Sequence, residues 1–151
     1  MTEVLPTMTR VITQRVACGW RHAWALAADP LRMPEWASGL SSGHFTREGA
    51  HWRFETAEGS RARVRFAPAN DFGVLDHWVM SEAPEGAAEI YLPFRVIGLG
   101  EDVCEFQFTL LRQPSMDDAA FERDARWIAR DLRTLRDLLE AAPPVRPVGR
   151  G

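Results

Sequence analysis

Hydrophobic and polar residues alternate along several short stretches of the chain, as they do in strands that bury one face. Residues 9–17 set Ile12 and Val16 against Arg10 and Arg15. Similar patterns, separated by short turns, predict further strands at 51–56, 61–66, 74–81, 89–97 and 103–111. Because short links join strands as antiparallel hairpins, we expect an antiparallel sheet.

The spacing of apolar residues becomes helical after the first strand. From Trp20 onward these residues recur on one helical face. The helix is expected to end at Asp29, because a residue that precedes a proline, here Pro30, avoids helical geometry. A second short helix is predicted around 33–39.

The clearest helical pattern closes the chain, over residues 117–140. Its apolar positions recur every three or four residues and are Phe121, Ala125, Ile128, Leu132, Leu135 and Leu139. Ser115 stands three residues before Asp118, a spacing similar to that of a capping box. At roughly 1.5 Å per residue this helix would be about 36 Å long, enough to cross a whole sheet.

The order of these elements predicts an α+β fold. A strand, one or two short helices, a run of strands and a long helix favour a curved antiparallel sheet of six to seven strands wrapped around the C-terminal helix. A twisted sheet cannot follow a straight helix along its full length, so a space should open between them. We expect one domain over 1–141 and a flexible Pro/Gly/Arg tail over 142–151.

Composition and charge limit the classes of function. With 46% hydrophobic and 26% charged residues the chain is an ordinary globular protein, and its net charge of −3 offers no footprint for nucleic acid. It contains no lysine, which excludes lysine-based catalysis. Cys18 and Cys104 form no paired motif, so two reduced core thiols are expected. Because no long apolar run or signal segment is visible, we expect a cytoplasmic protein that does not insert into membranes.

Several local phrases of the sequence resemble those of a known superfamily. They are DP at 29–30, PEW at 34–36, FGVLDHWV at 72–79, FTLLRQP at 108–114 and FERD at 121–124. Together with the order of elements, they are similar to the START-like, helix-grip superfamily, also called SRPBCC, which includes polyketide cyclases and lipid carriers. The resemblance covers roughly residues 9–140. It implies a deep, mostly apolar cavity under the long helix, and it supplies no universal catalytic motif.

Catalytic and metal-binding motifs are not recognisable in the sequence. The histidines lack the HxxxH or HExxH spacing of metal sites; they are His22, His44, His51 and His77. No GxSxG nucleophile elbow or dinucleotide-binding glycine pattern occurs. We therefore expect neither a metal nor a cofactor.

The adjacent pair Asp76 and His77 is the most suggestive polar feature. In a strand the two side chains would point to opposite faces. If Val74, Trp78 and Met80 face inward, Asp76 lies inside the cavity with them. If Leu75 and Val79 face inward instead, His77 lies inside. An interior carboxylate would have a raised pKa unless the charge of a nearby arginine compensated for its burial. We favour a carboxylate hydrogen-bonded to a neighbouring strand or loop over an acid–base group.

Arg112 follows the apolar face of the last strand, to which Phe106 and Phe108 belong. Its guanidinium is expected either to reach the cavity mouth and hold a ligand carboxylate or phenolate, or to cap carbonyls of a helix or loop. Trp36, in a predicted loop beside Gly39, is the preferred mouth or lid residue. The full set of predicted cavity residues is Trp24, Trp36, Trp52, Phe54, Asp76, Trp78, Phe94, Phe106, Phe108, Arg112, Ile128 and Leu132.

These observations favour binding of a hydrophobic small molecule (a lipid, an aromatic or a polyketide-like compound) in an internal cavity, by a carrier or sensor. One alternative is a polyketide cyclase, aromatase or dehydratase in which Arg112 or Asp76 moves protons or holds an enolate. Another is a protein-interaction module that uses the outer face of the sheet. A homodimer is compatible with each of these.

Overall fold

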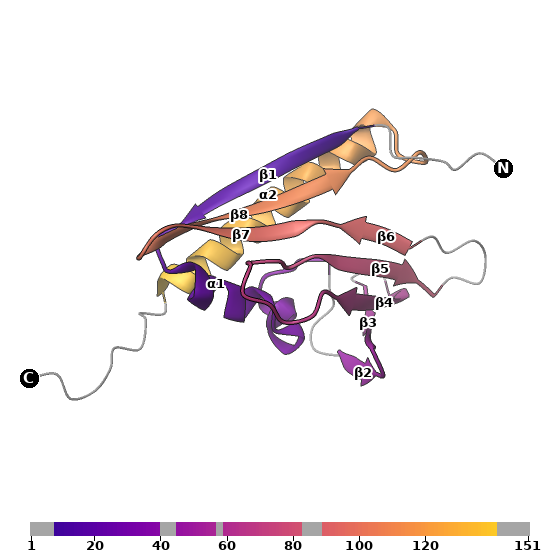
Figure 1. Cartoon of the computed structure of the whole chain (residues 1–151). Coiled ribbons are helices and arrows are strands. Elements are labelled where there is room, and N and C mark those ends of the chain that lie inside the picture. The colour runs from indigo at the N-terminus through magenta and orange to yellow at the C-terminus, as the bar shows by residue number, and fades with distance from the viewer. Residues whose placement is uncertain (1–7, 40–44, 57–58, 83–88, 142–151) are drawn as a thin grey trace, which may run out of the picture.

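A computed structural model of the protein describes residues 8–39, 45–56, 59–82 and 89–141 (Figure 1). Its elements are, in chain order, β1 (Thr9–Val16), α1 (Trp20–Ala27), the 3-10 helix η1 (Pro30–Glu35), β2 (Thr46–Glu48), β3 (His51–Glu55), β4 (Arg61–Phe66), β5 (His77–Ser81), β6 (Glu89–Leu92), β7 (Phe94–Gly100), β8 (Val103–Leu111) and α2 (Asp118–Ala141). The predicted flexible tail, 142–151, lies outside the described residues, as does His44.

The described strands form two antiparallel sheets. One has the order β1–β8–β7 and the other the order β2–β3–β4–β5–β6. The described residues form eight strands, where the sequence predicts six or seven. The α+β class and the long C-terminal helix are confirmed, and the described strands do not close into a barrel.

The strand predicted at 89–97 is divided at Pro93 into β6 and β7. Proline has no N–H to give to a strand ladder, so regular pairing stops there. The two sheets remain joined across this point, because the Pro93 carbonyl accepts the N–H of Thr109 at 2.9 Å and the Phe94 carbonyl accepts that of Leu75 at 2.8 Å. Pro93 thus marks the change from one sheet to the other.

The strand predicted at 74–81 begins three residues late, at His77. Before it, Val74 makes only an isolated bridge to Arg95. Gly73 adopts a left-handed φ of 73° and its carbonyl accepts the N–H of Val96 at 2.9 Å. A turn that glycine permits therefore replaces the regular start of the strand.

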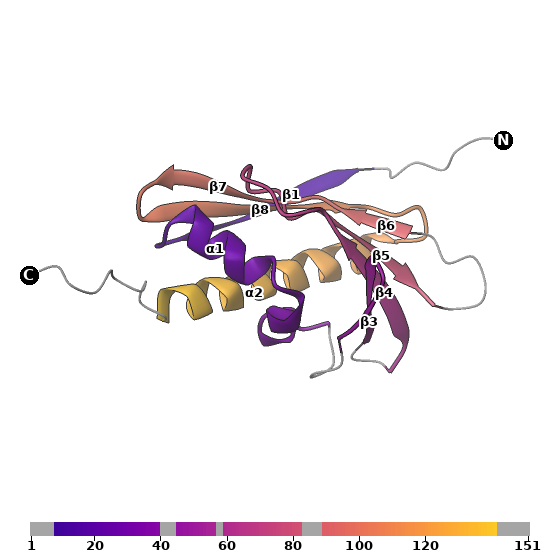
Figure 2. The same ribbon diagram turned by 60° about the horizontal axis from the view of Figure 1, so that its bottom comes forward.

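Both α-helices lie on one side of the β1–β8–β7 sheet, as Figure 2 shows. Their shared core includes Ala23 of α1, Phe106 of β8, and Leu132 and Leu135 of α2, each at most 1% exposed. α2 packs mainly against β1 and β8. Its other long edge lies toward β5 and β6, and this offset creates the site described below.

The ends of the helices differ in detail from the prediction. Asp117, and not Ser115, caps α2, because its Oδ1 accepts the N–H of Ala120 at 2.7 Å. The short helix expected at 33–39 occurs earlier, as η1, where Asp29 Oδ1 accepts the N–H of Leu31 at 3.0 Å and Pro30 occupies the first position. Proline at a helix start, which the prediction treated only as a terminator, explains this shift.

Cys18 and Cys104 are both free and buried, in agreement with the expectation of reduced core thiols. Burial raises the pKa of the Cys104 thiol to about 12 and also raises that of Cys18. Neither thiol is therefore a ready nucleophile at neutral pH.

Candidate functional site

An apolar groove runs between α2 and strands β5, β6 and β8. Its volume is about 310 Å³, at the lower end of the usual range for small-molecule sites. Apolar side chains line most of it, namely Val79, Ile90, Leu92, Phe108, Leu110, Leu111, Met116, Trp127 and Ile128. Gly39, Gln113, Asp124 and Asp131 complete the lining.

The helical wall of the groove is a single stripe of α2. Asp124, Trp127, Ile128 and Asp131 follow the i, i+3, i+4, i+7 spacing that places residues on one helical face. This stripe lies beside the core stripe to which Leu132 and Leu135 belong. α2 therefore presents one edge to the packed core and a neighbouring edge to the groove.

Trp127 is unusually exposed for a large aromatic residue, with 44% of its surface accessible to solvent. The Arg123 guanidinium lies 5.6 Å from its ring centroid and 3.6 Å from a carboxylate oxygen of Asp124. A wide apolar ring is thus accessible at the rim of an apolar recess, which is typical of surfaces that take a ligand.

Asp131 stands at the end of the groove where Gly39 lies. Its Oδ1 accepts the N–H of Ser38 at 3.2 Å, and Arg130 Nη2 donates to the Ser38 hydroxyl at 3.0 Å. Burial raises the pKa of Asp131 above its usual value, although the Ser38 hydrogen bonds and the charge of Arg130 act to lower it.

Of the cavity residues predicted from the sequence, Phe108 and Ile128 line this groove. Four others, Trp24, Trp36, Asp76 and Phe94, line a separate, small cavity between α1, η1 and the sheet. That cavity measures about 30 Å³, which is room for one or two water molecules but not for a hydrophobic ligand. Trp36, expected at a mouth, is 5% exposed, and its indole Nε1 has no hydrogen-bond partner in the described structure.

Asp76 and His77 are both buried, each 6% exposed, although they are adjacent. Strict alternation does not separate them, because the regular strand starts only at His77. Asp76 turns toward the β6–β7 junction, where it accepts hydrogen bonds from the Tyr91 hydroxyl at 2.7 Å and the Phe94 N–H at 2.9 Å. Arg95 Nε lies 3.5 Å from its Oδ1. Burial acts to raise the pKa of Asp76, but these hydrogen bonds and the charge of Arg95 more than offset it and leave the pKa below its usual value. The hydrogen-bonded reading of Asp76 agrees with this geometry.

His77 points into an aromatic interior. Its ring lies 5.9 Å from the centroids of Phe66 and Phe108 and 6.3 Å from that of Phe94. Its Nδ1 is 3.1 Å from the Leu75 carbonyl, which can only accept, so Nδ1 carries the proton of the neutral ring. Burial lowers the pKa of His77, while the bond to Leu75 and the charge of Asp76 act to raise it. Phe108 separates His77 from the groove.

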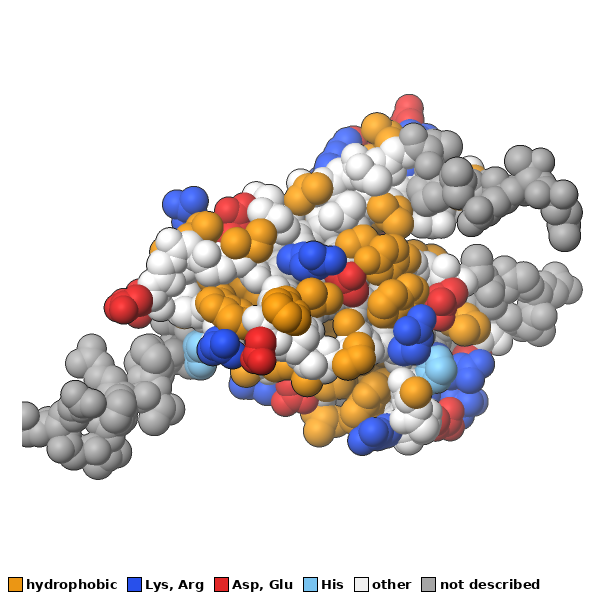
Figure 3. Space-filling model, viewed as in Figure 1, with side chains coloured by type: hydrophobic (Ala, Val, Ile, Leu, Met, Phe, Trp, Pro, Cys, Tyr) orange, Lys and Arg blue, Asp and Glu red, His pale blue; other side chains and the backbone are white. Residues whose placement is uncertain are grey.

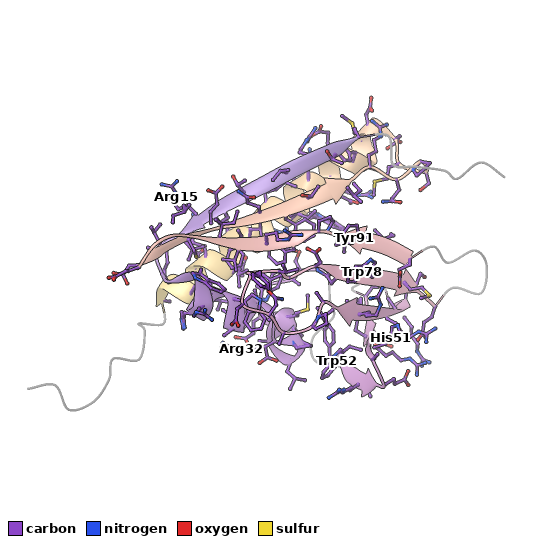
Figure 4. All side chains as sticks on the ribbon, viewed as in Figure 1. Arg15, Arg32, His51, Trp52, Trp78 and Tyr91 are labelled. Atoms are coloured by element: carbon purple, nitrogen blue, oxygen red, sulfur yellow. The ribbon has the colours of Figure 1, made fainter. Side chains whose placement is uncertain are left out.

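Trp78 faces the outside of the sheet, as Figure 4 shows. It stacks on Tyr91 with ring centroids 5.2 Å apart, and the Arg65 guanidinium lies 4.2 Å above its ring. Trp52 and Phe54, both on β3, pack around Phe45 in a separate cluster with Ala62 and Val64 of β4. Phe106 and Leu132, 0% and 1% exposed, belong to the solid core. The structure therefore disperses these five predicted residues.

Arg112 turns away from the groove toward the start of α2. Its Nε and Nη2 donate to the Met116 carbonyl at 3.3 and 3.2 Å, and its Nη1 lies 2.7 Å from a carboxylate oxygen of Asp118. Of the two roles expected for it, the structure gives it the capping of a loop carbonyl. An arginine at the cavity mouth is not found among the described lining residues.

Several groove residues are not among the predicted cavity residues. Val79 shares the parity of His77, a register left open by the sequence, and the pairing of β5 with β6 places Ile90 beside Val79 and Leu92 beside His77. Asp124 and Asp131 read as ordinary solvated positions of an amphipathic helix. They are recognised as groove residues only in the structure, where this side of α2 faces β5, β6 and β8.

Within the described residues no group of three His, Cys, Asp or Glu side chains is placed to hold a metal ion. Over the same residues, no helix combines the length and the apolar character needed to span a membrane.

Comparison of sequences with protein-family models and with curated proteins gave no match. Comparison with solved structures gave many matches. Protein XoxI from Bacillus cereus superimposes with a TM-score of 0.70 at 14% identity, over 89% of this chain and 96% of that chain. A START superfamily protein from Mycobacterium smegmatis gives 0.64 at 14% identity, over 88% and 97%. The di-domain ARO/CYC BexL from the BE-7585A biosynthetic pathway gives 0.67 at 13% identity, over 89% of this chain and 47% of that one. The chain thus has the START-like, helix-grip fold that the sequence resembles, and at these identities the likeness concerns the fold alone.

Proposed function

We propose that the protein binds a hydrophobic small molecule in the groove between α2 and strands β5, β6 and β8, as a carrier or sensor. The observation that carries the proposal is the groove itself, a recess of about 310 Å³ with a mostly apolar lining. Burial of apolar surface would drive binding, at roughly 25 cal/mol per Å² removed from water. The START-like fold supports a ligand-binding role in general terms.

The size of the groove favours a compact ligand. About 310 Å³ suits a single ring system or a short chain better than a whole phospholipid. Trp127 at the rim would cover such a ligand with its exposed ring. The free buried thiols are compatible with a reducing compartment, so we place this binding in the cytoplasm.

The cyclase or dehydratase alternative has less support from the geometry. Asp76 is held by Tyr91, Phe94 and Arg95, and Arg112 is bound to Met116 and Asp118. Neither residue belongs to the described lining of the groove. A substrate bound there would meet neither of the groups expected to move its protons.

The interaction-module alternative requires a continuous apolar patch on the outer face of the sheet. Figure 3 shows that hydrophobic side chains on this face lie among charged ones. Arg65 covers Trp78, and the exposed Ile97 pairs across the strands with Glu105. This mixture is ordinary for a solvated sheet, and a homodimer through it stays a prediction.

A titration with a neutral, environment-sensitive dye such as Nile red tests the proposal. Val79→Trp would fill the groove from β5, and Val11→Trp places the same change on the exposed outer face of β1, where Val11 is 54% exposed. We expect wild type and Val11→Trp to bind the dye with equal affinity, and Val79→Trp to bind it at least about tenfold more weakly.

Thermal melting of both variants verifies that they fold. Leu92→Trp, on the paired strand β6, offers a second way to fill the groove if Val79→Trp does not fold. Equal dye binding by wild type and a folded groove-filling variant would contradict the proposal.

A further inference from the structure

The ionisable side chains that line the groove carry charge of one sign. Asp124 and Asp131 are both carboxylates, and the described lining contains no arginine or histidine. Arg112, the cation closest to this end of β8 in sequence, is engaged with Met116 and Asp118. A ligand in the groove therefore meets negative charge that no cationic side chain of the described lining balances.

The two carboxylates differ in their partners. Asp124 lies 3.6 Å from Arg123 Nε, so it already has a cation beside it. Asp131 has no arginine within ion-pair distance in the described structure; its direct partner is Ser38. Arg130 lies near enough to act on its pKa, but it donates to the Ser38 hydroxyl, and burial outweighs its effect.

Asp76 offers a comparison, because it is a buried carboxylate whose hydrogen bonds hold the two sheets together. Tyr91, the Phe94 N–H and Arg95 surround Asp76, and its pKa falls below the usual value. At Asp131 the effect of burial outweighs the effects of the Ser38 hydrogen bonds and of Arg130, so the pKa is raised. A half-buried carboxylate with spare acceptor capacity at the end of an apolar recess is placed to receive a donor from outside the chain.

We infer that the ligand of the groove carries a protonated amine, which Asp131 binds while the apolar part lies against Trp127 and Ile128. The inference rests on the proposed function and names the class of ligand for the same groove. An ammonium group supplies the cation that Asp131 lacks and fills its free acceptor positions. It can also approach the face of the Trp127 ring.

The same charges select against other hydrophobic molecules. A fatty-acid carboxylate would be brought beside two carboxylates in a site of low polarity, where repulsion between like charges is strong. A neutral alcohol would gain the apolar contact and one hydrogen bond, without the charge interaction. The order of affinities is therefore ammonium, alcohol, carboxylate.

Three probes with the same alkyl chain test this order: octylammonium chloride, octanol and sodium octanoate. Their affinities are measured at neutral pH and moderate salt by displacement of the neutral dye. We expect wild type to bind octylammonium at least about tenfold more tightly than octanoate, with octanol between them. Equal affinities, or tighter binding of octanoate, would overturn the inference.

Asp131→Asn and Asp124→Asn form a matched pair of variants. An asparagine at 131 keeps one oxygen for the Ser38 N–H, removes the charge and replaces the second acceptor oxygen with an NH2 donor. We expect Asp131→Asn to lose most of the preference for octylammonium with octanol binding unchanged, and Asp124→Asn to lose less, since Arg123 already offsets that carboxylate. A preference that survives Asp131→Asn would also overturn the inference.

The outcomes separate this inference from the proposed function. If octanol binds and octylammonium is not preferred, the groove is a ligand site and the assignment of an amine is wrong. If none of the three probes displaces the dye or binds directly by calorimetry, the proposed function fails and the inference fails with it.

Discussion

Asp76 and His77 are buried side by side, yet they are stabilised in different ways. Asp76 remains a carboxylate because Tyr91, the Phe94 N–H and Arg95 compensate its burial. His77 is enclosed by phenyl rings, and within the described residues its ring hydrogen-bonds to the Leu75 carbonyl. It is therefore a neutral core residue at neutral pH, and its protonation should oppose folding.

The lowered pKa of His77 gives the stability a pH dependence. Its usual value is 6.5, so below that pH the unfolded chain takes up a proton that the folded protein resists. The contribution is fully present above pH 6.5 and is lost as the pH falls toward the folded-state pKa, by at most about 1.4 kcal/mol per pH unit. Denaturant unfolding at about pH 7.5 and about pH 5.5 measures this loss.

His77→Phe, which suits a site walled by phenyl rings, is expected to remove this part of the pH dependence. The exposed His22 provides the control, and His22→Gln should keep the fall seen in wild type. The same fall in wild type and His77→Phe would show that another group is responsible.

For the site, single polar residues are the hardest positions to predict from the sequence. Asp131 is indistinguishable from other charged positions of α2 until the helix is placed beside the sheet. Arg112 was expected either at the mouth or as a cap, and only its contacts with Met116 and Asp118 decide between these roles. The type of a residue indicates whether its position is exposed to solvent, but not which groups its side chain contacts.

At the scale of elements, the junction between the two sheets depends on a close approach of the turn at Gly73 to β7. A Cβ at Gly73 would lie 2.1 Å from the Val96 carbonyl oxygen, and the backbone there has a φ of 73°. The Val96 N–H donates to the Gly73 carbonyl across the same contact. Neither the conformation nor the space allows a side chain.

Gly73→Ala is therefore expected to lower the free energy of unfolding by about 3 kcal/mol, from left-handed strain and overpacking together. Gly59→Ala is the matched control, because Gly59 has a φ of 84° but open space around its Cβ position. It should cost about 1 kcal/mol, from strain alone. Equal losses in denaturant unfolding would mean that the contact with Val96 contributes nothing.

Regular elements were predicted well where one physical rule dominated. Alternation placed β1, β3, β4 and β8 within a residue or so of their observed bounds, and the apolar stripe placed α2 equally well. Errors arose at Pro93 and before His77, where a missing N–H and a glycine turn interrupt a pattern that still looks regular in sequence. Periodicity reports which face is buried but not where pairing stops.

At the scale of the whole molecule, the groove results from an offset between α2 and the two sheets. α2 packs mainly on β1 and β8, and its second edge overhangs β5 and β6. The sequence predicts that a long straight helix must part from a twisted sheet. It does not predict where they part. Of the predicted cavity residues, Phe108 and Ile128 line the groove, Trp24 and Phe94 line the small cavity near α1, and Leu132 lies in the core.

The central claim is that a hydrophobic molecule enters this groove, and the tryptophans of the chain report on it directly. Trp127 lines the groove, whereas Trp78 lies on the opposite, outer face, stacked on Tyr91. Their indole N–H signals in a proton–nitrogen correlation spectrum can be assigned with Trp127→Phe and Trp78→Phe. Addition of octanol should shift the Trp127 signal in a saturable manner and leave that of Trp78 in place. An unmoved Trp127 signal, or a saturable shift at Trp78 instead, would contradict the account.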